Sequence, residues 1–309
     1  MGIAVDIKDI SKSYENVQAL KNISLQVNES ELFGFIGPDG AGKTTLFRIL
    51  TTLLLADEGE ANLAGLDVVK DYKKLRTMLG YMPGKFSLYQ DLSVEENLNF
   101  FAGIFNSNIE ENRYLIDDIY TQIELFKKRK AGALSGGMKQ KLALSCALIH
   151  KPKILLLDEP TTGVDAVSRI EFWDMLDRLK EQGITILVST PYMDEASRCD
   201  RIALIQKGEI MQIDDPEKIL EGFQPILYGV KALDMYQLVQ HLRTYTACHS
   251  AHLFGEWTHF TTPSEINTDK LKTFLQNKGS QQVEIKRLKP NVEDSFMELM
   301  TQKEGGAHE

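Results

Sequence analysis

The first part of the chain shows three patterns of apolar and polar positions: continuous apolar runs, strict alternation and helical spacing. Residues 32–36 and 154–157 are continuous apolar runs, which indicate parallel strands buried on both faces. Alternating apolar and polar residues over 4–27 predict a short antiparallel sheet, whereas helical spacing from Ser93 to about Phe126 predicts a helical insertion. Together they predict an α/β domain with an antiparallel β subdomain and a helical subdomain at about 86–149.

The pattern changes near Gly222. Beyond it, residues 225–288 read as a strand, a helix, a hairpin around Gly255-Glu256, a second helix and a strand. This βαββαβ order is the split βαβ arrangement of ferredoxin-like domains, and a closing helix over 291–302 follows. We therefore expect a first domain over 1–222, a small C-terminal α+β domain over 223–301 and a tail over 302–309.

The segment after the strand at 32–36 matches the phosphate-loop pattern of Gly, four residues and Gly-Lys-Thr in full. Its glycines let successive backbone N–H groups point inward, and the following helix N-terminus adds partial positive charge. We expect Lys43 to reach the β- and γ-phosphates of a nucleotide and the Thr44 hydroxyl to ligate Mg²⁺. The predicted phosphate-binding residues are Gly37, Pro38, Asp39, Gly40, Ala41, Gly42, Lys43, Thr44 and Thr45.

The apolar run at 154–157 ends in two acids, Asp158 and Glu159. The carboxyl end of a buried parallel strand projects its side chains toward the phosphate loop. Asp158 is therefore placed to hold the Mg²⁺ shell, and Glu159 to orient or deprotonate the attacking water. Tyr14, on a turn ahead of the phosphate loop, is either core filling or a surface on which adenine stacks.

A second anion-binding shape, Leu134-Ser-Gly-Gly-Met138, precedes a helix that we expect over 139–150. A Ser-Gly-Gly turn is common on its own, so its meaning depends on the motifs around it. The order of phosphate loop, this turn and the acid-terminated strand resembles the ATP-binding subunit of an ABC transporter. The resemblance covers about residues 3–220.

The resemblance implies a P-loop NTPase core of ABC type that binds ATP and Mg²⁺ and dimerises head to tail. In such a dimer the signature residues of one chain bind the ATP held by the other chain's phosphate loop. Tyr14 matches the family's adenine-stacking position, and Asp165 matches the loop that touches the opposite active site. The signature residues are Leu134, Ser135, Gly136, Gly137 and Met138.

Among subfamilies the chain most resembles exporters whose membrane subunit is a separate chain. This implies integral membrane permease subunits and a second ATP-binding subunit as partners, at the cytoplasmic face of the membrane. The alternative is a soluble regulatory ABC-type ATPase that acts on ribosomes or nucleic acid. The net charge of -9 argues against that alternative, because binding nucleic acid needs clustered Lys and Arg.

Composition adds that a 43% hydrophobic chain can build a substantial core. The cysteines Cys146, Cys199 and Cys248 are scattered and odd in number, which favours a reducing compartment over a disulfide framework. We find neither a signal-peptide pattern at the N-terminus nor an apolar stretch near the ~20 residues that span a bilayer. We therefore expect a soluble, cytoplasmic protein that associates with the membrane through its partners.

Three positions depart from the family pattern. Gly84 stands where the family has a glutamine, Pro191 where it has a histidine, and Asp39 where asparagine is more common. Gln90 lies too far along to replace the missing glutamine. Loss of one catalytic hydrogen-bond donor costs roughly 10²–10³ in rate. We expect ATP binding to survive and hydrolysis at this chain's own site to be impaired, unless Glu159 alone suffices in a homodimer.

The C-terminal hairpin carries a further candidate. A two-residue turn at Gly255-Glu256 makes His252 face His259, with Cys248 on the same face of its strand. These side chains suit either a metal site, which needs a further ligand or a water, or solvated polar positions. We favour solvated polar positions.

Overall fold

The computed structural model describes residues 2–305, which form two compact units that divide between Pro216 and Glu217. The boundary expected from composition was Gly222, and the short helix α7 (Pro216–Glu221) lies between the two positions. Each unit has its own hydrophobic core and is described by itself. Within residues 2–305, no helix is both long and apolar enough to cross a bilayer.

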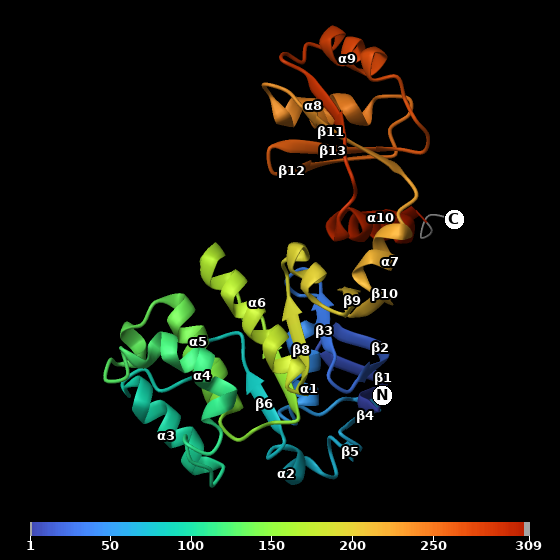
Figure 1. Ribbon diagram of the computed structural model, residues 1–309. Coiled ribbons are helices and arrows are strands. Elements are labelled where there is room, and N and C mark those ends of the chain that lie inside the picture. Colours follow the sequence, from blue (N-terminus) through green and yellow to red (C-terminus); the bar gives the residue numbers. More distant parts are fainter. Residues whose placement is uncertain (1, 306–309) are drawn as a thin grey trace. The chain divides into compact units, whose positions relative to one another are not determined.

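A six-stranded sheet forms the centre of the first unit (Figure 1). Five neighbouring strands, in the order β9-β3-β8-β7-β6, are parallel, and β10 pairs with β9 in antiparallel orientation. As the apolar runs predict, every residue of β3 and β7 is buried. The strands are β3 (Leu32–Ile36), β6 (Leu79–Met82), β7 (Ile154–Asp158), β8 (Thr185–Thr190), β9 (Arg201–Gln206) and β10 (Glu209–Asp214).

The expected antiparallel subdomain is a four-stranded sheet in the order β2-β1-β4-β5. One hydrophobic cluster joins its side chains to those of β3 and of the helix α1 (Lys43–Leu50). Within it, Phe35 and Phe47 pack edge to face with ring centroids 5.6 Å apart. The phosphate loop therefore connects a buried strand to a buried helix. The strands are β1 (Ile3–Tyr14), β2 (Val17–Asn28), β4 (Glu58–Leu63) and β5 (Leu66–Asp67).

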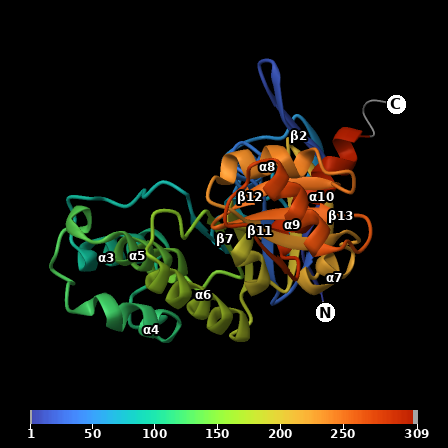
Figure 2. The same cartoon turned by 90° about the horizontal axis from the view of Figure 1, so that it is seen from above.

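The helical subdomain gathers α3, α4 and α5 to one side of the two sheets (Figure 1 and Figure 2). Residues 93–96, Ser-Val-Glu-Glu, form a capping box at the start of α3, since the Ser93 hydroxyl accepts from the Glu96 N–H and the Glu96 carboxylate accepts from the Ser93 N–H. The helices are α3 (Val94–Ile104), α4 (Arg113–Glu124), the 3₁₀ turn η1 (Ala131–Ala133) and α5 (Gly136–Leu148); elsewhere in the unit lie α2 (Tyr72–Leu75), α6 (Ala166–Glu181) and the 3₁₀ helix η2 (Met193–Arg198).

The second unit has the expected βαββαβ order and an antiparallel sheet in the order β12-β13-β11-β14. Its core includes Tyr228 and Phe260 from the sheet and Leu238 and Leu271 from the two helices. These features confirm the ferredoxin-like prediction. The elements are β11 (Ile226–Lys231), α8 (Met235–Arg243), β12 (Ser250–Phe254), β13 (Trp257–Thr262), α9 (Thr268–Asn277), β14 (Glu284–Arg287) and the closing helix α10 (Val292–Gly305).

The histidine register in the hairpin is confirmed, because His252 pairs with His259 across β12 and β13. Across residues 2–305, however, no set of three or more His, Cys, Asp or Glu side chains is arranged to hold a metal ion. The favoured reading of solvated positions is also wrong for His259, whose side chain is 11% exposed and whose Nδ1 lies 2.6 Å from Asp294 Oδ1. Asp294 belongs to α10, so this helix covers the ring.

Candidate nucleotide site

Two glycines of the phosphate loop, Gly37 and Gly42, lie where a side chain larger than hydrogen has no room. A Cβ on Gly37 would lie 2.1 Å from the Ile205 carbonyl oxygen. Gly42 has a left-handed backbone with φ of 105°, and a Cβ there would lie 2.4 Å from the Ala19 carbonyl oxygen. Glycine is the residue that meets both demands. The glycine pattern of the sequence therefore has a packing cause as well as a phosphate-binding one.

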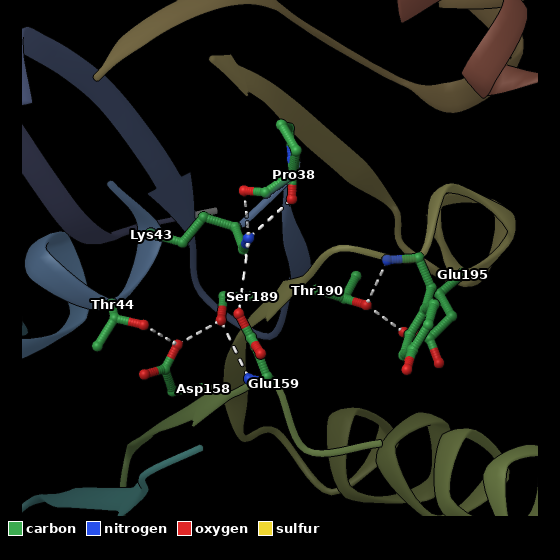
Figure 3. A network of polar contacts seen from close by, with 10 residues as sticks. Pro38, Lys43, Thr44, Asp158, Glu159, Ser189, Thr190 and Glu195 are labelled. Carbon is green, nitrogen blue, oxygen red and sulfur yellow. Dashed lines mark hydrogen bonds and ion pairs between the residues drawn. The ribbon is translucent and has the colours of Figure 1, made fainter. Parts of the chain in front are cut away.

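Lys43 lies at the start of α1 and is 3% exposed. Its Nζ donates to the carbonyl oxygens of Gly37 at 2.7 Å and Pro38 at 3.0 Å, and lies 3.6 Å from Glu159 Oε1 (Figure 3). Burial lowers the pKa of Lys43, and the carboxylates of Glu159, Asp39 and Asp158 oppose that shift. The cation is thus held inside the loop by backbone carbonyls, in the cradle where phosphate oxygens are expected.

Asp158 ends β7 and is 2% exposed. Its Oδ1 accepts from the Thr44 hydroxyl at 3.2 Å and from the Ser189 hydroxyl at 2.6 Å (Figure 3). Ser189 lies opposite Asp158 in the β7–β8 register. Sequence reasoning missed Ser189, because only the pairing of the two strands brings it to the acid.

Glu159 has a backbone conformation that is rare for its residue type. Its φ is 51°, in the left-handed region, which costs roughly 1–3 kcal/mol in a residue with a side chain. Its N–H donates to the carbonyl oxygen of Ser189 at 3.0 Å and to the Ser189 hydroxyl at 3.1 Å. Neighbouring groups therefore hold a strained residue at the position expected to activate water.

A cavity of about 740 Å³ opens beside the loop. Tyr14, which is 42% exposed, lines it together with Lys43, Thr44 and Glu159. The structure thus brings the expected aromatic side chain and phosphate-binding residues around one space. Lys21 and Lys207, which no motif predicted, add two further lysines to the wall.

The signature turn lies outside this cavity, whose walls within residues 2–305 include neither 134–138 nor Asp165. The helix α5 begins at Gly136, three residues earlier than the pattern predicted, because Ser135 caps it by accepting from the Met138 N–H at 3.3 Å. A Cβ on Gly136 would lie 2.9 Å from the Gly163 carbonyl oxygen. The turn therefore packs closely against the loop that contains Asp165.

Asp165 caps α6, and its carboxylate accepts from the Ser168 N–H at 3.0 Å. Backbone and side-chain hydrogen bonds with Ser168 lower the pKa of this carboxyl group. The signature turn and the Asp165 loop therefore form one surface, separate from the cavity of the same chain.

Comparison with known proteins identifies the family of this chain. Residues 20–162 match the ABC transporter family. Over 303 residues the chain is 30% identical to the Nod factor export ATP-binding protein I of Mesorhizobium japonicum, covering 96% of this chain and 86% of that protein. The chain belongs to the ATP-binding proteins of ABC transporters.

Other members of this family extend the comparison. The chain is 36% identical over 293 residues to the probable multidrug ABC transporter ATP-binding protein YbhF of Escherichia coli; this covers 94% of the chain but spans only 50% of that relative. The solved ATP-binding cassette MJ0796, a dimer bound to ADP and phosphate, aligns with a TM-score of 0.62 at 28% identity, covering 68% of this chain and 98% of that one. The subunit cbiO1 of Clostridium perfringens aligns with a TM-score of 0.64 at 26% identity, covering 72% and 92%. The cassette fold expected from the sequence is confirmed.

Two residues that depart from the ABC pattern belong to segments next to the acids. A Cβ on Gly84 would lie 3.1 Å from the Asp158 carbonyl oxygen and 3.8 Å from Glu159 Cβ. Pro191 directly follows Thr190, the last residue of β8. Gln90 lies elsewhere, with its carbonyl oxygen accepting from the Gly132 N–H at 2.9 Å. Gly84 therefore borders the acids, and Pro191 lies two residues after Ser189, which contacts both acids.

A second cavity, of about 420 Å³, lies between the core sheet and the helical subdomain of the ABC cassette. Pro83, Phe86, Phe101, Phe105 and His150 are among the residues that line it. The His150 ring stacks on Phe105 with centroids 3.8 Å apart, and its Nε2 lies 2.9 Å from the Leu79 carbonyl oxygen. His150 Nδ1 is buried without a hydrogen-bond partner among the described residues. We call this cavity the apolar groove.

Proposed function

We propose that this chain is the ATP-hydrolysing subunit of an ABC exporter and drives transport by dimerising head to tail around MgATP. The single observation that carries the proposal is the meeting of Lys43, Thr44 and Glu159 at one cavity, with the buried Asp158 hydrogen-bonded to Thr44. A cation for phosphates, two oxygen ligands for a metal and a base for water are the parts that phosphoryl transfer to water needs. The names of the relatives, which refer to multidrug transport and Nod factor export, support export as the direction.

ATP binding requires Lys43 to exchange its carbonyl partners for the β- and γ-phosphate oxygens, since its ammonium group already points into the cradle. Tyr14 is available to stack on adenine from the other end of the cavity. The Thr44 hydroxyl and Asp158 carboxylate fit Mg²⁺, because both are hard oxygen ligands. Their oxygens are 3.2 Å apart, close to the about 3 Å between neighbouring ligands of an octahedral ion. Bound Mg²⁺ would neutralise charge that develops on the phosphates.

Hydrolysis requires water to attack the γ-phosphorus while the bond to the ADP oxygen breaks. Glu159 accepts the proton that the water loses, and ADP and phosphate leave. Lys43, whose Nζ lies 3.6 Å from Glu159 Oε1, keeps that carboxylate next to the phosphates. Gly84 and Pro191 offer no side-chain donor beside these groups, so we propose that hydrolysis at this site is slow.

A second ATP-binding chain completes each site in our proposal. The signature turn and Asp165 share a surface away from their own cavity, which suits a role on the ATP of a partner. This chain lends an intact signature, while its own acid cluster lacks two donors. We therefore propose a heterodimer with a related, complete ATPase, in which this chain's own site serves as an ATP-holding clamp.

A membrane permease subunit is the second partner, and the apolar groove supports this. Pro83 lines the groove, and the next residue, Gly84, lies against the Asp158 backbone. A helix docked in the groove would thus contact Pro83, the residue that precedes Gly84. We propose that permease docking there couples transport to ATP hydrolysis at the cytoplasmic face of the membrane.

Calorimetry with MgATP tests the nucleotide assignment. Lys43→Ala should weaken binding at least tenfold, because it removes a side-chain cation aimed at the phosphates. Lys70→Ala, which removes the same charge from an 82% exposed side chain outside the cavity, is the matched control and should bind normally. Equal affinities for Lys43→Ala and the unmodified chain would exclude the assignment.

Rate measurements test the heterodimer. Alone, the chain should hydrolyse ATP at a negligible rate; a coexpressed paralogue should restore the rate, and Ser135→Ala in this chain should remove it again. The opposing result is an isolated chain that works in the range of about 1–10³ s⁻¹ typical of enzymes and is inactivated by Glu159→Gln. That result would support a homodimer in place of the heterodimer.

A further inference from the structure

A buried carboxylate lies behind the catalytic acids and has no place in the mechanism above. Glu195 belongs to η2 and is 3% exposed. Its Oε2 accepts from the Thr190 hydroxyl at 2.5 Å (Figure 3). Its Oε1 accepts from the Thr161 hydroxyl at 2.8 Å. It does not line the nucleotide cavity. A buried charge is costly unless it is paired and hydrogen-bonded, which makes this carboxylate a candidate for a specific role.

The two hydroxyl groups belong to the segments that carry the acids. Thr161 lies two residues after Glu159, in the turn that leaves β7. Thr190 ends β8 and directly follows Ser189, whose hydroxyl contacts both Asp158 and the Glu159 N–H. Through two hydrogen bonds, one carboxylate therefore connects the turn after β7 to the end of β8.

A charge partner reaches Glu195 from α6. Arg169 Nε lies 3.5 Å from Glu195 Oε1, and its Nη2 lies 2.5 Å from the exposed carboxylate of Asp194. The guanidinium also packs over the ring of Tyr192, 5.0 Å from its centroid. The carboxylate thus receives two hydroxyl donors and one cation, which compensates its burial.

Glu159 is the residue whose backbone conformation needs support from its neighbours. Its left-handed backbone, with φ of 51°, persists only where surrounding groups over-determine it. On the upstream side its N–H is held by Ser189. On the downstream side its carbonyl oxygen accepts from the Thr162 N–H at 3.2 Å, and the intervening Thr161 is anchored by Glu195. Both flanks of the strained residue are therefore fixed.

We infer that Glu195 is a positioning residue for hydrolysis: it anchors Thr161 and Thr190 and so holds Glu159 in the left-handed conformation that aims its carboxylate at the attacking water. The inference rests on the proposed role of Glu159 as the base. Glu195 does not line the nucleotide cavity, although the carbonyl oxygen of Thr190 accepts from the Gly37 N–H of the phosphate loop at 3.3 Å. We therefore expect hydrolysis to depend on Glu195 more strongly than ATP binding does.

Steady-state kinetics, on whichever assembly hydrolyses ATP, separate positioning from binding. Glu195→Gln keeps the shape but loses the charge and one acceptor oxygen, so kcat should fall roughly 10- to 100-fold while KM changes less than about twofold. Thr161→Val, which removes only the hydroxyl, should have the same effect. Asp194→Asn is the matched control: it is the adjacent acid, shares Arg169 and touches neither threonine, so kcat should stay unchanged.

Glu159→Gln provides the decisive background. If Glu195 acts through Glu159, adding Glu195→Gln to Glu159→Gln should lower the residual rate no further. An equal fold-loss in both backgrounds, or a loss of ATP affinity parallel to the loss of rate, would overturn the inference and leave a general structural role.

Hydrogen exchange gives a readout that does not need hydrolysis. In Glu195→Gln and Thr161→Val, peptides that span 157–164 should exchange faster, whereas those that span 37–50 should not. Unchanged exchange at 157–164 would refute the anchor. If instead Glu159→Gln leaves hydrolysis intact while exchange responds as expected, the proposed role of Glu159 fails and the anchor stands.

Discussion

At the scale of single residues, burial decides which side chains respond to protons. His150 stacks on Phe105 in the apolar groove, with Nε2 next to the Leu79 carbonyl and Nδ1 without a partner among the described residues. Burial lowers the pKa of His150 below its usual 6.5, and the Leu79 hydrogen bond opposes that shift in part. The ring is therefore held neutral, with one nitrogen as a donor to the backbone and the other as a free acceptor.

Acid should destabilise the protein through this ring. Below pH 6.5 the unfolded His150 binds a proton before the folded one does, so stability falls as the pH drops through the window beneath 6.5. Thermal unfolding at pH 7 and pH 5 should show a larger loss for the unmodified protein than for His150→Phe, which cannot titrate. Between pH 7 and 8 the two curves should run parallel, and parallel curves down to pH 5 would contradict the prediction.

At the scale of elements, the register between β7 and β8 assembles the acid cluster. Ser189 pairs with Asp158, donates to its carboxylate and accepts from the Glu159 N–H. The strained Glu159 and the buried Asp158 thus share one hydroxyl from the neighbouring strand. Two adjacent strands, in one register, hold both acids in place.

Removing that hydroxyl should cost stability. Ser189→Ala takes from the buried Asp158 carboxylate the closer of its two hydroxyl donors, a loss of about 1–3 kcal/mol in the free energy of unfolding. Urea denaturation measures it. Ser197→Ala, at an exposed serine that donates to the Asp194 carbonyl, should change stability by less than about 0.5 kcal/mol. Similar losses in the two variants would argue against a special role for Ser189.

At the scale of the whole molecule, the chain consists of two units with separate cores. All the nucleotide-site residues belong to the first unit, and the second completes its own four-stranded sheet and covers it with α8, α9 and α10. We propose that the C-terminal unit regulates or stabilises the dimer and takes no part in ATP binding.

Truncation after Gly222 tests this division, because the cut retains α7 and removes the rest of the second unit. The shortened chain should bind MgATP in calorimetry with the affinity of the full chain, while its dimerisation in sedimentation experiments or its support of transport should change. A shortened chain that does not fold, or that loses ATP, would show that the two units depend on one core.

Local patterns in the sequence determined much of this protein. The buried runs at 32–36 and 154–157 became the central strands β3 and β7, because a continuous apolar run needs cover on both faces. The phosphate-loop glycines, the capping box at Ser93 and the βαββαβ order were also predictable. Each depends on residues that lie close together in the chain.

Tertiary structure alone decided which distant residues meet. Ser189 reaches Asp158 through strand pairing, and Glu195 reaches Thr161 through the path of the chain after β8. From the sequence, His259 is expected to be either a solvated or a metal-binding residue. In the structure it contacts Asp294 of α10. No local pattern encodes these contacts, because they arise from strand register and from burial against elements far along the chain, and burial is what makes each polar contact matter.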